Sequence, residues 1–327
     1  MSADRGVRPA TPGAALARTL LALAIATVLL ALCFRGVDAP RLAAVVARAG
    51  LAWLVAAVAL NAAIPMLWAL QWRLFLPRPS ELGLRGMYAL TATMAMLANS
   101  VPMLLGTVSG THLLATRGRV GYPTALSILA LDQLLEGLAK LAMLFALAAV
   151  TPLPAPLRGA LWMLTAGVGA LLAVVTTATW SYGRYRLPRY IREWAAGLRG
   201  VRRPEVLAGG LALGLAMKGA EMGGILAVQH ALGVELPLWS ALAVLAAVNV
   251  STMVSVSPGN VGVYEGSAFL AYGALGVDGE TALALALLQH VAYLLAMAGS
   301  GWLLMLGQAA AGAAPAGETL RPLRARS

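Results

Sequence analysis

The chain alternates between long apolar runs and short stretches that hold most of the charged residues. Several runs reach about 20 residues without a charge, the length that a helix needs to cross a bilayer. The pattern therefore predicts an all-α polytopic membrane protein. We expect spanning helices at residues 20–34 and at about 122–150, 157–181, 206–232 and 281–307.

The first apolar run also resembles a signal peptide, because Arg5, Arg8 and Arg18 precede it. A helix that stays in the membrane is the better interpretation. Further apolar runs follow it, and no good small-residue cleavage site precedes Arg35.

A motif of proline, glycine and glutamine interrupts the apolar pattern twice. The residues of the first copy recur 156 positions later, as 258 − 102 shows for the two prolines. The four pairs are Pro102 and Pro258, Gly106 and Gly262, Gly110 and Gly266, and Gln133 and Gln289. Paired interruptions at corresponding places in two halves of a membrane protein indicate a transport site.

Loop charge gives the expected orientation, because short cytoplasmic loops are rich in Lys and Arg. The loop at 183–204 has only Glu193 as an acidic residue, and its basic residues are Arg184, Arg186, Arg189, Arg192, Arg199, Arg202 and Arg203. We place this loop in the cytoplasm, together with the N-terminal arm and the C-terminal tail at 313–327. The expected location is the inner (plasma) membrane of a cell.

With this orientation, the interrupted segments enter the membrane from opposite sides, 86–118 from the cytoplasm and 238–276 from outside. The predicted fold is a single transmembrane domain at 1–312 with two inverted-topology repeats, at about 50–150 and 206–307. Each repeat is a helix, a broken re-entrant hairpin and a helix, and extra spanning helices accompany them. Alternatively, each hairpin consists of two ordinary spans with a proline kink. Both interpretations place the polar breaks inside the bundle.

Composition supports the membrane class and excludes others. The chain is 60% hydrophobic and 11% charged, with a mean hydropathy of +0.79, which is not typical of a soluble domain. The net charge of +11 does not predict nucleic-acid binding, because the Arg residues lie where membrane loops carry them and no nucleic-acid-binding motif accompanies them. Cys33 is the only cysteine, which excludes an intrachain disulfide and a cysteine metal cluster.

Ionisable residues within the apolar runs are candidate site residues, because each costs about 2.5–3.5 kcal/mol to insert at the bilayer centre. Asp132, Glu136 and Lys140 recur at every fourth position and share one helix face. In one interpretation Glu136 neutralises Lys140, which leaves Asp132 unmatched or hydrated. Lys218 and Glu221, three residues apart, are either an internal pair or a functional one.

Glu265 lies in the second interrupted segment without a basic residue nearby in sequence. We therefore expect it to be protonated, paired across the bundle or hydrated. The corresponding residue in the first copy of the motif is Ser109, so the two interrupted segments differ chemically at this position. His290, beside Gln289, is either a proton relay or a hydrogen-bonded packing residue. No metal-binding or catalytic motif is present, so we expect no metal, no cofactor and no enzyme activity.

Residues 187–201 show helical apolar spacing with Arg residues between. This pattern predicts an amphipathic helix on the cytoplasmic leaflet, where Arg favours anionic headgroups. A solvated loop is the alternative.

The segment Ser257-Pro258-Gly259-Asn260-Val261-Gly262-Val263-Tyr264-Glu265 resembles the Pro-Gly-x-x-Gly-x-x-Glu signature of the lysylphosphatidylglycerol synthase transmembrane family. The first copy, from Asn99 to Gly106, is similar to the family's earlier Asn-x-x-Pro-x-x-x-Gly element. The resemblance implies a flippase-like protein of the bacterial inner membrane that moves lipids between leaflets. The chain has Thr107 where the family pattern has Glu, and Gln133 where it often has Arg. If the family's Glu and Arg bind phosphate or couple protons, we do not expect that role at these two positions. The chain ends shortly after the last expected helix, and we expect no aminoacyl-transfer domain.

Our hypothesis is a stand-alone lipid translocase that works by alternating access, with membrane lipids, mainly anionic ones, as its partners. Backbone N–H groups at the broken tips would receive the headgroup. The candidate substrate-binding residues are Pro102, Gly106, Gln133, Lys140, Lys218, Pro258, Gly259, Asn260, Gly262 and Gln289. The candidate coupling residues are Glu265, Asp132, Glu136, Glu221 and His290. The alternatives are a proton- or ion-coupled transporter of a small polar solute and a scaffold for lipid-modifying enzymes.

Overall fold

The computed structural model describes residues 12–76, 83–100, 103–118, 120–182, 184–186, 188–253 and 257–310. Every regular element within these ranges is a helix. In chain order they are α1 (Pro12–Phe34), α2 (Ala39–Ala47), α3 (Leu51–Ala62), α4 (Ile64–Phe75), α5 (Leu84–Ser100), α6 (Met103–Arg117), α7 (Tyr122–Val150), α8 (Ala155–Ser181), α9 (Arg189–Gly197), η1 (Leu198–Arg202), α10 (Pro204–Ala231), α11 (Leu238–Ser251), η2 (Pro258–Asn260), α12 (Val263–Ala274) and α13 (Gly279–Ala310).

Five stretches of the described chain are long and apolar enough to cross a membrane. They are Leu51–Phe75, Tyr122–Val150, Ala155–Ser181, Pro204–Ala231 and Gly279–Gly307. The first of them combines α3 and α4, which meet at a turn at Ala63. Pro65 lies in the first turn of α4, where its missing N–H removes one helical bond and accounts for the break.

The helices on either side of the two sequence interruptions are shorter than these spans. Helices α5, α6, α11 and α12 have 17, 15, 14 and 12 residues. At 1.5 Å per residue they reach about 18–26 Å, less than the ~30 Å hydrocarbon core. Between α11 and α12, Gly259, Asn260 and Gly262 have positive φ angles of 61°, 57° and 86°, and this backbone turns the chain.

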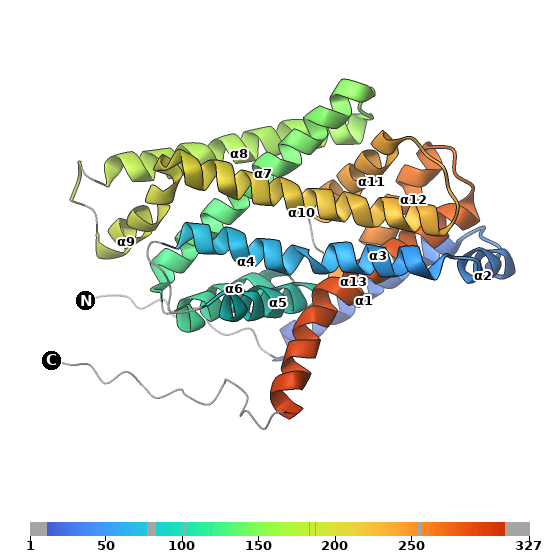
Figure 1. The fold of residues 1–327 in the computed structure, drawn as a ribbon, viewed down its shortest axis with the longest axis horizontal. Helices are drawn as coiled ribbons and strands as arrows, with labels where there is room; N and C mark the ends of the chain where they lie inside the picture. Colours follow the sequence, from blue (N-terminus) through green and yellow to red (C-terminus); the bar gives the residue numbers. More distant parts are fainter. Residues whose placement is uncertain are drawn as a thin grey trace.

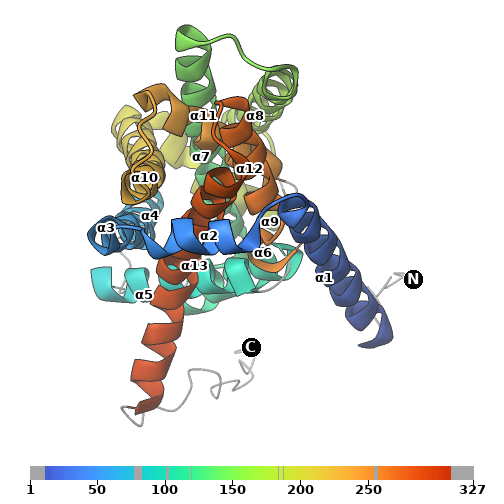
Figure 2. The same cartoon turned by 90° about the vertical axis from the view of Figure 1, so that its right-hand side faces the viewer.

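The helix pairs on either side of the interruptions lie toward opposite ends of the molecule, whereas the second interruption contacts the C-terminal end of α5: a Cβ on Gly259 would lie 3.0 Å from the Asn99 carbonyl oxygen. Helices α3 and α4 lie beside α10 along the long axis, α5 and α6 pack together at one end, and α11 and α12 pack together toward the other (Figure 1). Helix α13 contacts α5, α12 and α3, and α7 contacts α10 and α11. Figure 2 shows α1 at the edge of the bundle, and this helix packs against α12.

The outer surface is apolar and the interior holds charge, the reverse of a soluble protein. Large side chains such as Trp162, Met163 and Leu303 are exposed, whereas Asp132 and Glu265 are each only 5% exposed. A bilayer around the bundle accounts for both observations, since it solvates apolar surface and excludes unpaired charge.

The helix bounds confirm four of the five expected spans. Helix α7 matches 122–150, and the ends of α8, α10 and α13 differ from the predicted ranges by at most three residues. The run at 20–34 lies in α1, where the apolar helix Ala24–Phe34 is shorter than the five spans, so a spanning helix there stays a prediction. The amphipathic segment forms α9, which packs against α7 and leaves Tyr190 and Ile191 exposed. Its contact with a membrane surface stays a prediction, and the terminal arms lie outside the described residues.

The packing of α5 against α13 can be tested at Gly301. A Cβ there would lie 2.5 Å from Met96 Cβ and 2.6 Å from the Ala92 carbonyl oxygen. We expect Gly301→Ala to lower the thermal midpoint of the purified protein in detergent, because overpacking costs about 1–3 kcal/mol. Gly299→Ala is the matched control, since nothing lies within 4 Å of its added Cβ. Equal midpoints for the two variants would contradict this close approach.

Candidate functional site

A polar cavity of about 610 Å³ lies where α3, α4, α5, α7, α10, α11, α12 and α13 meet. Its polar and charged lining consists of Asn61, Gln71, Asp132, Gln133, Glu136, Lys140, Lys218, Glu221, Asn249, Thr252, Asn260, Tyr264, Gln289 and Tyr293. The volume falls within the range of about 300–1,000 Å³ that is typical of small-molecule sites. Helices from both sequence halves contribute, so the cavity depends on the whole bundle.

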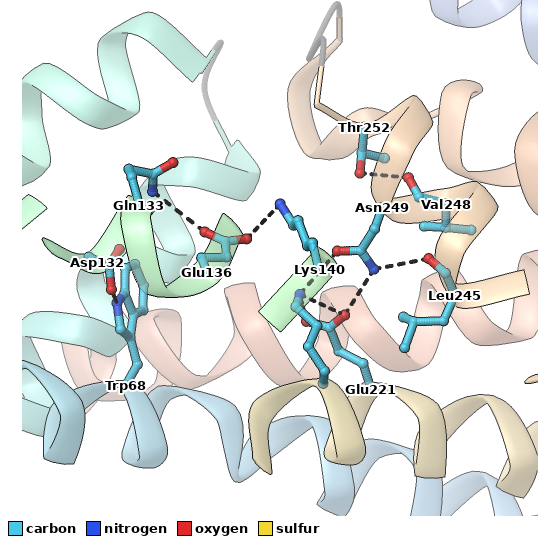
Figure 3. Close-up of polar contacts among 11 residues, drawn as sticks. Trp68, Asp132, Gln133, Glu136, Lys140, Glu221, Leu245, Val248, Asn249 and Thr252 are labelled. Atoms are coloured by element: carbon cyan, nitrogen blue, oxygen red, sulfur yellow. Dashed lines mark hydrogen bonds and ion pairs between the residues drawn. The ribbon is translucent and has the colours of Figure 1, made fainter. Parts of the chain in front are cut away.

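One ion pair belongs to α7. Lys140 Nζ lies 2.7 Å from Glu136 Oε1, and the Gln133 amide nitrogen donates to Glu136 Oε2 at 3.5 Å (Figure 3). The three side chains share one face of the helix, as their spacing predicts. Lys140 is thus neutralised within its own helix.

A second ion pair belongs to α10 and is tied to α11. Lys218 Nζ lies 2.8 and 3.1 Å from the two carboxylate oxygens of Glu221. The same ammonium donates to Asn249 Oδ1 at 3.0 Å, and the Asn249 amide nitrogen donates to Glu221 Oε2 at 3.2 Å. A third bond, from that nitrogen to the Leu245 carbonyl oxygen at 3.0 Å, fixes the amide (Figure 3). The three polar side chains therefore form a closed network.

Asp132 is bound by α4 and takes no part in either ion pair. The indole N–H groups of Trp68 and Trp72 both donate to Asp132 Oδ1 at 2.9 Å. Figure 3 shows Trp68 reaching from its helix toward the aspartate. Two donors from one neighbouring helix thus give this buried carboxyl group hydrogen-bond partners.

Unpaired amide oxygens are a further property of the cavity. Among the described residues, four buried side-chain atoms have no hydrogen-bond partner, and three of them belong to cavity-lining residues: Gln71 Oε1, Asn260 Oδ1 and Gln289 Oε1. The Gln71 amide nitrogen donates to the Gly210 carbonyl oxygen at 2.8 Å, which fixes the orientation of that amide. A buried acceptor without a donor costs about 1–3 kcal/mol. These oxygens are fully buried among protein atoms, so a ligand donor would recover this energy only after the amide turned toward the cavity.

Glu265 and His290 fasten the second interruption to α13. Glu265 Oε2 accepts the Gly262 N–H at 2.7 Å, and Glu265 Oε1 lies 2.7 Å from His290 Nδ1. His290 Nε2 lies 2.8 Å from the Gly259 carbonyl oxygen, which only accepts, so Nε2 carries a proton. The His290 ring also stacks on cavity-lining Tyr264, with ring centroids 4.2 Å apart. Of the three states expected for Glu265, the structure shows pairing across the bundle.

The contacts of Glu265 and His290 with Gly262 and Gly259, here called the clamp, change the expectation that a headgroup binds at Gly262. The Gly262 N–H was expected to receive a headgroup, but it already donates to Glu265. Helix α1 also covers this point, since a Cβ on Gly262 would lie 2.8 Å from the Ala26 carbonyl oxygen. The Gly262 N–H is therefore not available to a headgroup.

The structure brings most of the candidate residues together. The cavity is lined by Gln133, Lys140, Lys218, Asn260, Gln289, Asp132, Glu136 and Glu221. The interruption and its clamp contain Pro258, Gly259, Gly262, Glu265 and His290. Gly106 lies in α6, and Pro102 lies outside the described residues.

Sequence reasoning missed several residues that shape the cavity, notably Trp68, Gln71, Asn249 and Tyr293. A signal was present for two of them, because Gln71 and Asn249 are isolated amides within apolar runs. Isolated polar groups at membrane depth face the bundle interior. No pattern in the sequence indicated that tryptophans of α4 would bind Asp132.

A family model described as the lysylphosphatidylglycerol synthase TM region matches residues 19–301. The chain belongs to this family. The matched range includes the whole cavity lining. Searches of curated proteins and of solved structures found no match.

The family is a membrane domain associated with lipid-related functions. Together with the five apolar helices, membership makes this chain a multi-pass membrane protein.

The Lys218–Glu221 pair offers a test of the cavity. Lys218→Met leaves Glu221 without its cation, and removing one partner of a buried pair costs about 3–5 kcal/mol. We expect a lower thermal midpoint in detergent, and a partial recovery when Glu221→Gln is added, with a coupling energy of about 0.5–3 kcal/mol.

The matched control is the Arg189–Glu193 pair, which is 2.7 Å long, close to the 2.8 Å of Lys218–Glu221, but has side chains 82% and 40% exposed. The double-mutant cycle of Arg189→Met and Glu193→Gln should give a coupling energy below about 1 kcal/mol. Additive losses at Lys218 and Glu221 would contradict the buried network.

Proposed function

We propose that the protein is a lipid translocase that moves polar-headgroup lipids between leaflets by alternating access. The observation that supports this most is an apolar groove of about 320 Å³ beside the polar cavity. The groove is lined by Ala139, Ala142, Met143, Ala146, Leu215, Lys218, Gly219, Met222, Leu242 and Leu245, from α7, α10 and α11. Lys218 and Leu245 line both spaces, so the groove and the cavity adjoin.

The groove faces the lipid side of the bundle. Ala142, Ala146, Leu215 and Gly219 are all exposed on the outer surface. A lipid headgroup loses its hydrogen bonds to water when it crosses hydrocarbon, whereas an acyl chain needs no polar partner there. A polar cavity that adjoins an apolar groove accommodates both parts of one lipid molecule. A small polar solute would need the cavity alone.

The proposal includes two inverted-topology repeats at about 50–150 and 206–307. Helices α5, α6, α11 and α12 are too short to cross the bilayer, and the two pairs lie toward opposite ends of the long axis (Figure 1). Re-entrant hairpins entering from opposite leaflets would have this arrangement. Rocking of one repeat against the other would then open the cavity to each leaflet in turn.

We further propose that the end of the bundle with α9 faces the cytoplasm. Arg73 and Arg117 lie in the last turns of α4 and α6, which end on the same side of the molecule as α9 (Figure 1). Short cytoplasmic loops collect Arg in this way. Glu265 and His290 are proposed as the coupling proton site, because one proton lies between their paired atoms and the pair is buried. No catalytic step is part of the proposal.

A substitution at Gly219 tests the groove. Gly219 is exposed on α10 and nothing lies within 4 Å of an added Cβ, so Gly219→Leu starts its side chain in open space and extends it into the groove. We expect this variant to lower the rate of labelled-lipid movement in reconstituted vesicles by about tenfold, which corresponds to about 1.4 kcal/mol in the barrier. The measurement is a leaflet-resolved assay with a membrane-impermeant quencher.

The matched control is Gly169→Leu on α8, which also has open space around its added Cβ and lies away from the groove. This control should transport lipid at the rate of the unmodified protein. Solute uptake without lipid movement would instead favour the solute transporter, and the absence of both activities would favour the scaffold.

A further inference from the structure

We infer that the cavity selects a lipid whose headgroup is rich in hydroxyl groups, a sugar or a polyol, over one whose only polar group is a phosphate. The inference rests on the proposed function and concerns the same cavity. Three observations support it: the pairing of the lysines, the unpaired amide oxygens and the aromatic lining.

The lysines of the cavity are not available as counter-ions for a bare phosphate. Lys140 lies 2.7 Å from Glu136, and Lys218 lies 2.8 Å from Glu221. Asp132 adds a third carboxyl group to the lining, which contains no arginine among the described residues. A phosphate bound to either ammonium would therefore compete with a carboxylate for the positive charge, and it would lie near that carboxylate's negative charge. This pairing argues against the anionic headgroup that the sequence suggested.

The unpaired atoms of the cavity residues are acceptors. Gln71 and Gln289 are only 1% and 3% exposed, and each has an amide oxygen without a donor, as does Asn260. An oxygen acceptor binds an O–H or N–H group and repels a phosphate oxygen. Gln71 is the clearest case because its nitrogen is already bound to Gly210. Once the amides turn toward the cavity, hydroxyl groups would satisfy these oxygens and could in turn donate to or accept from the ion pairs.

Aromatic side chains complete the lining. Trp68, Tyr264 and Tyr293 all line the cavity. Tyr264 is held by its stacking on His290 at 4.2 Å, so its ring is a fixed surface. Such rings offer a flat apolar face with a polar edge, which suits a ring-shaped or polyhydroxylated group with apolar C–H faces. Choline-type headgroups lack the donors that the amide oxygens require.

The test compares four lipids with identical labelled acyl chains. Glucosyldiacylglycerol has hydroxyls without phosphate, phosphatidylinositol has both, phosphatidic acid has phosphate alone, and phosphatidylcholine has no headgroup donor. Binding of each to the purified full-length protein is measured in detergent micelles. We expect the first two to bind about tenfold more tightly than the last two, the effect of one or two hydrogen bonds.

Transport of the same four lipids is measured in vesicles, so that the two proposals can fail separately. Tighter binding of phosphatidic acid, or equal binding of all four, overturns the hydroxyl preference whether or not lipids move. A hydroxyl preference in binding without any lipid movement leaves the inference standing and overturns the translocase proposal. Phosphatidylinositol binding far above glucosyldiacylglycerol would show that phosphate is required, and would also overturn the inference.

Substitution of Gln71 locates the preference within the cavity. Gln71→Met removes the unpaired oxygen at nearly constant volume, and we expect the binding ratio of glucosyldiacylglycerol to phosphatidic acid to fall by about fivefold. Gln229→Met is the control for loss of a buried amide, since Gln229 is 2% exposed, lies off the cavity and donates to Tyr272 Oη at 3.1 Å. An unchanged ratio in folded Gln71→Met would contradict this assignment, and the four-lipid comparison decides the inference even if this variant does not fold.

Discussion

Two lysines lie against two glutamates inside a bundle whose outer surface is apolar, and much of the architecture follows from this requirement for pairing. Each ionised group costs about 2.5–3.5 kcal/mol to insert alone, so four isolated charges would consume the stability of a typical domain. The chain places both pairs within single helices, at spacings of four and three residues. Each helix can therefore enter the membrane already neutralised. The remaining polar groups, Asp132 and Asn249, depend instead on neighbouring helices for their partners.

The interruption before α12 shows how irregular backbone is made compatible with this environment. Its carbonyl and N–H groups cannot be left without partners in hydrocarbon. Glu265 and His290 supply these partners for Gly262 and Gly259, and both side chains are almost fully buried. The clamp also fixes Tyr264 through ring stacking, so the same contacts that satisfy the backbone give the cavity one rigid wall. If the pair also has the proposed coupling role, its protonation would affect both this backbone contact and transport.

The sequence predicted the helices well because apolar runs of membrane length leave few alternatives, as the agreement of α7 with 122–150 shows. It also predicted that ionisable residues gather inside the bundle, since an isolated charge at that depth is unfavourable. It left Asp132 unmatched or hydrated and did not predict its bonds to Trp68 and Trp72, because these lie on a helix whose rotation is set by packing. Nor could it foresee that the Gly262 N–H is taken by Glu265, which depends on a backbone turn with positive φ. Local spacing determined what was predicted, and contacts between helices determined what was missed.

The distribution of bonds within and between helices also bears on how the cavity could open. Each ion pair lies within a single helix, Glu136–Lys140 in α7 and Lys218–Glu221 in α10, so motion of one helix relative to another leaves both pairs intact. The bonds that join α10 to α11 run through Asn249, a neutral side chain, and those that join α4 to α7 are indole donors to one oxygen of Asp132. Each bond of this kind contributes about 1.5–3 kcal/mol, less than the cost of exposing an unpaired buried charge. The interruption, in contrast, is fastened to α13 by the Glu265–His290 pair, so α12 and α13 should move as one body. In the proposed alternating-access mechanism, the α10–α11 contact would then be the place where the helices part, and Lys218 and Leu245, which line both the cavity and the groove, lie there.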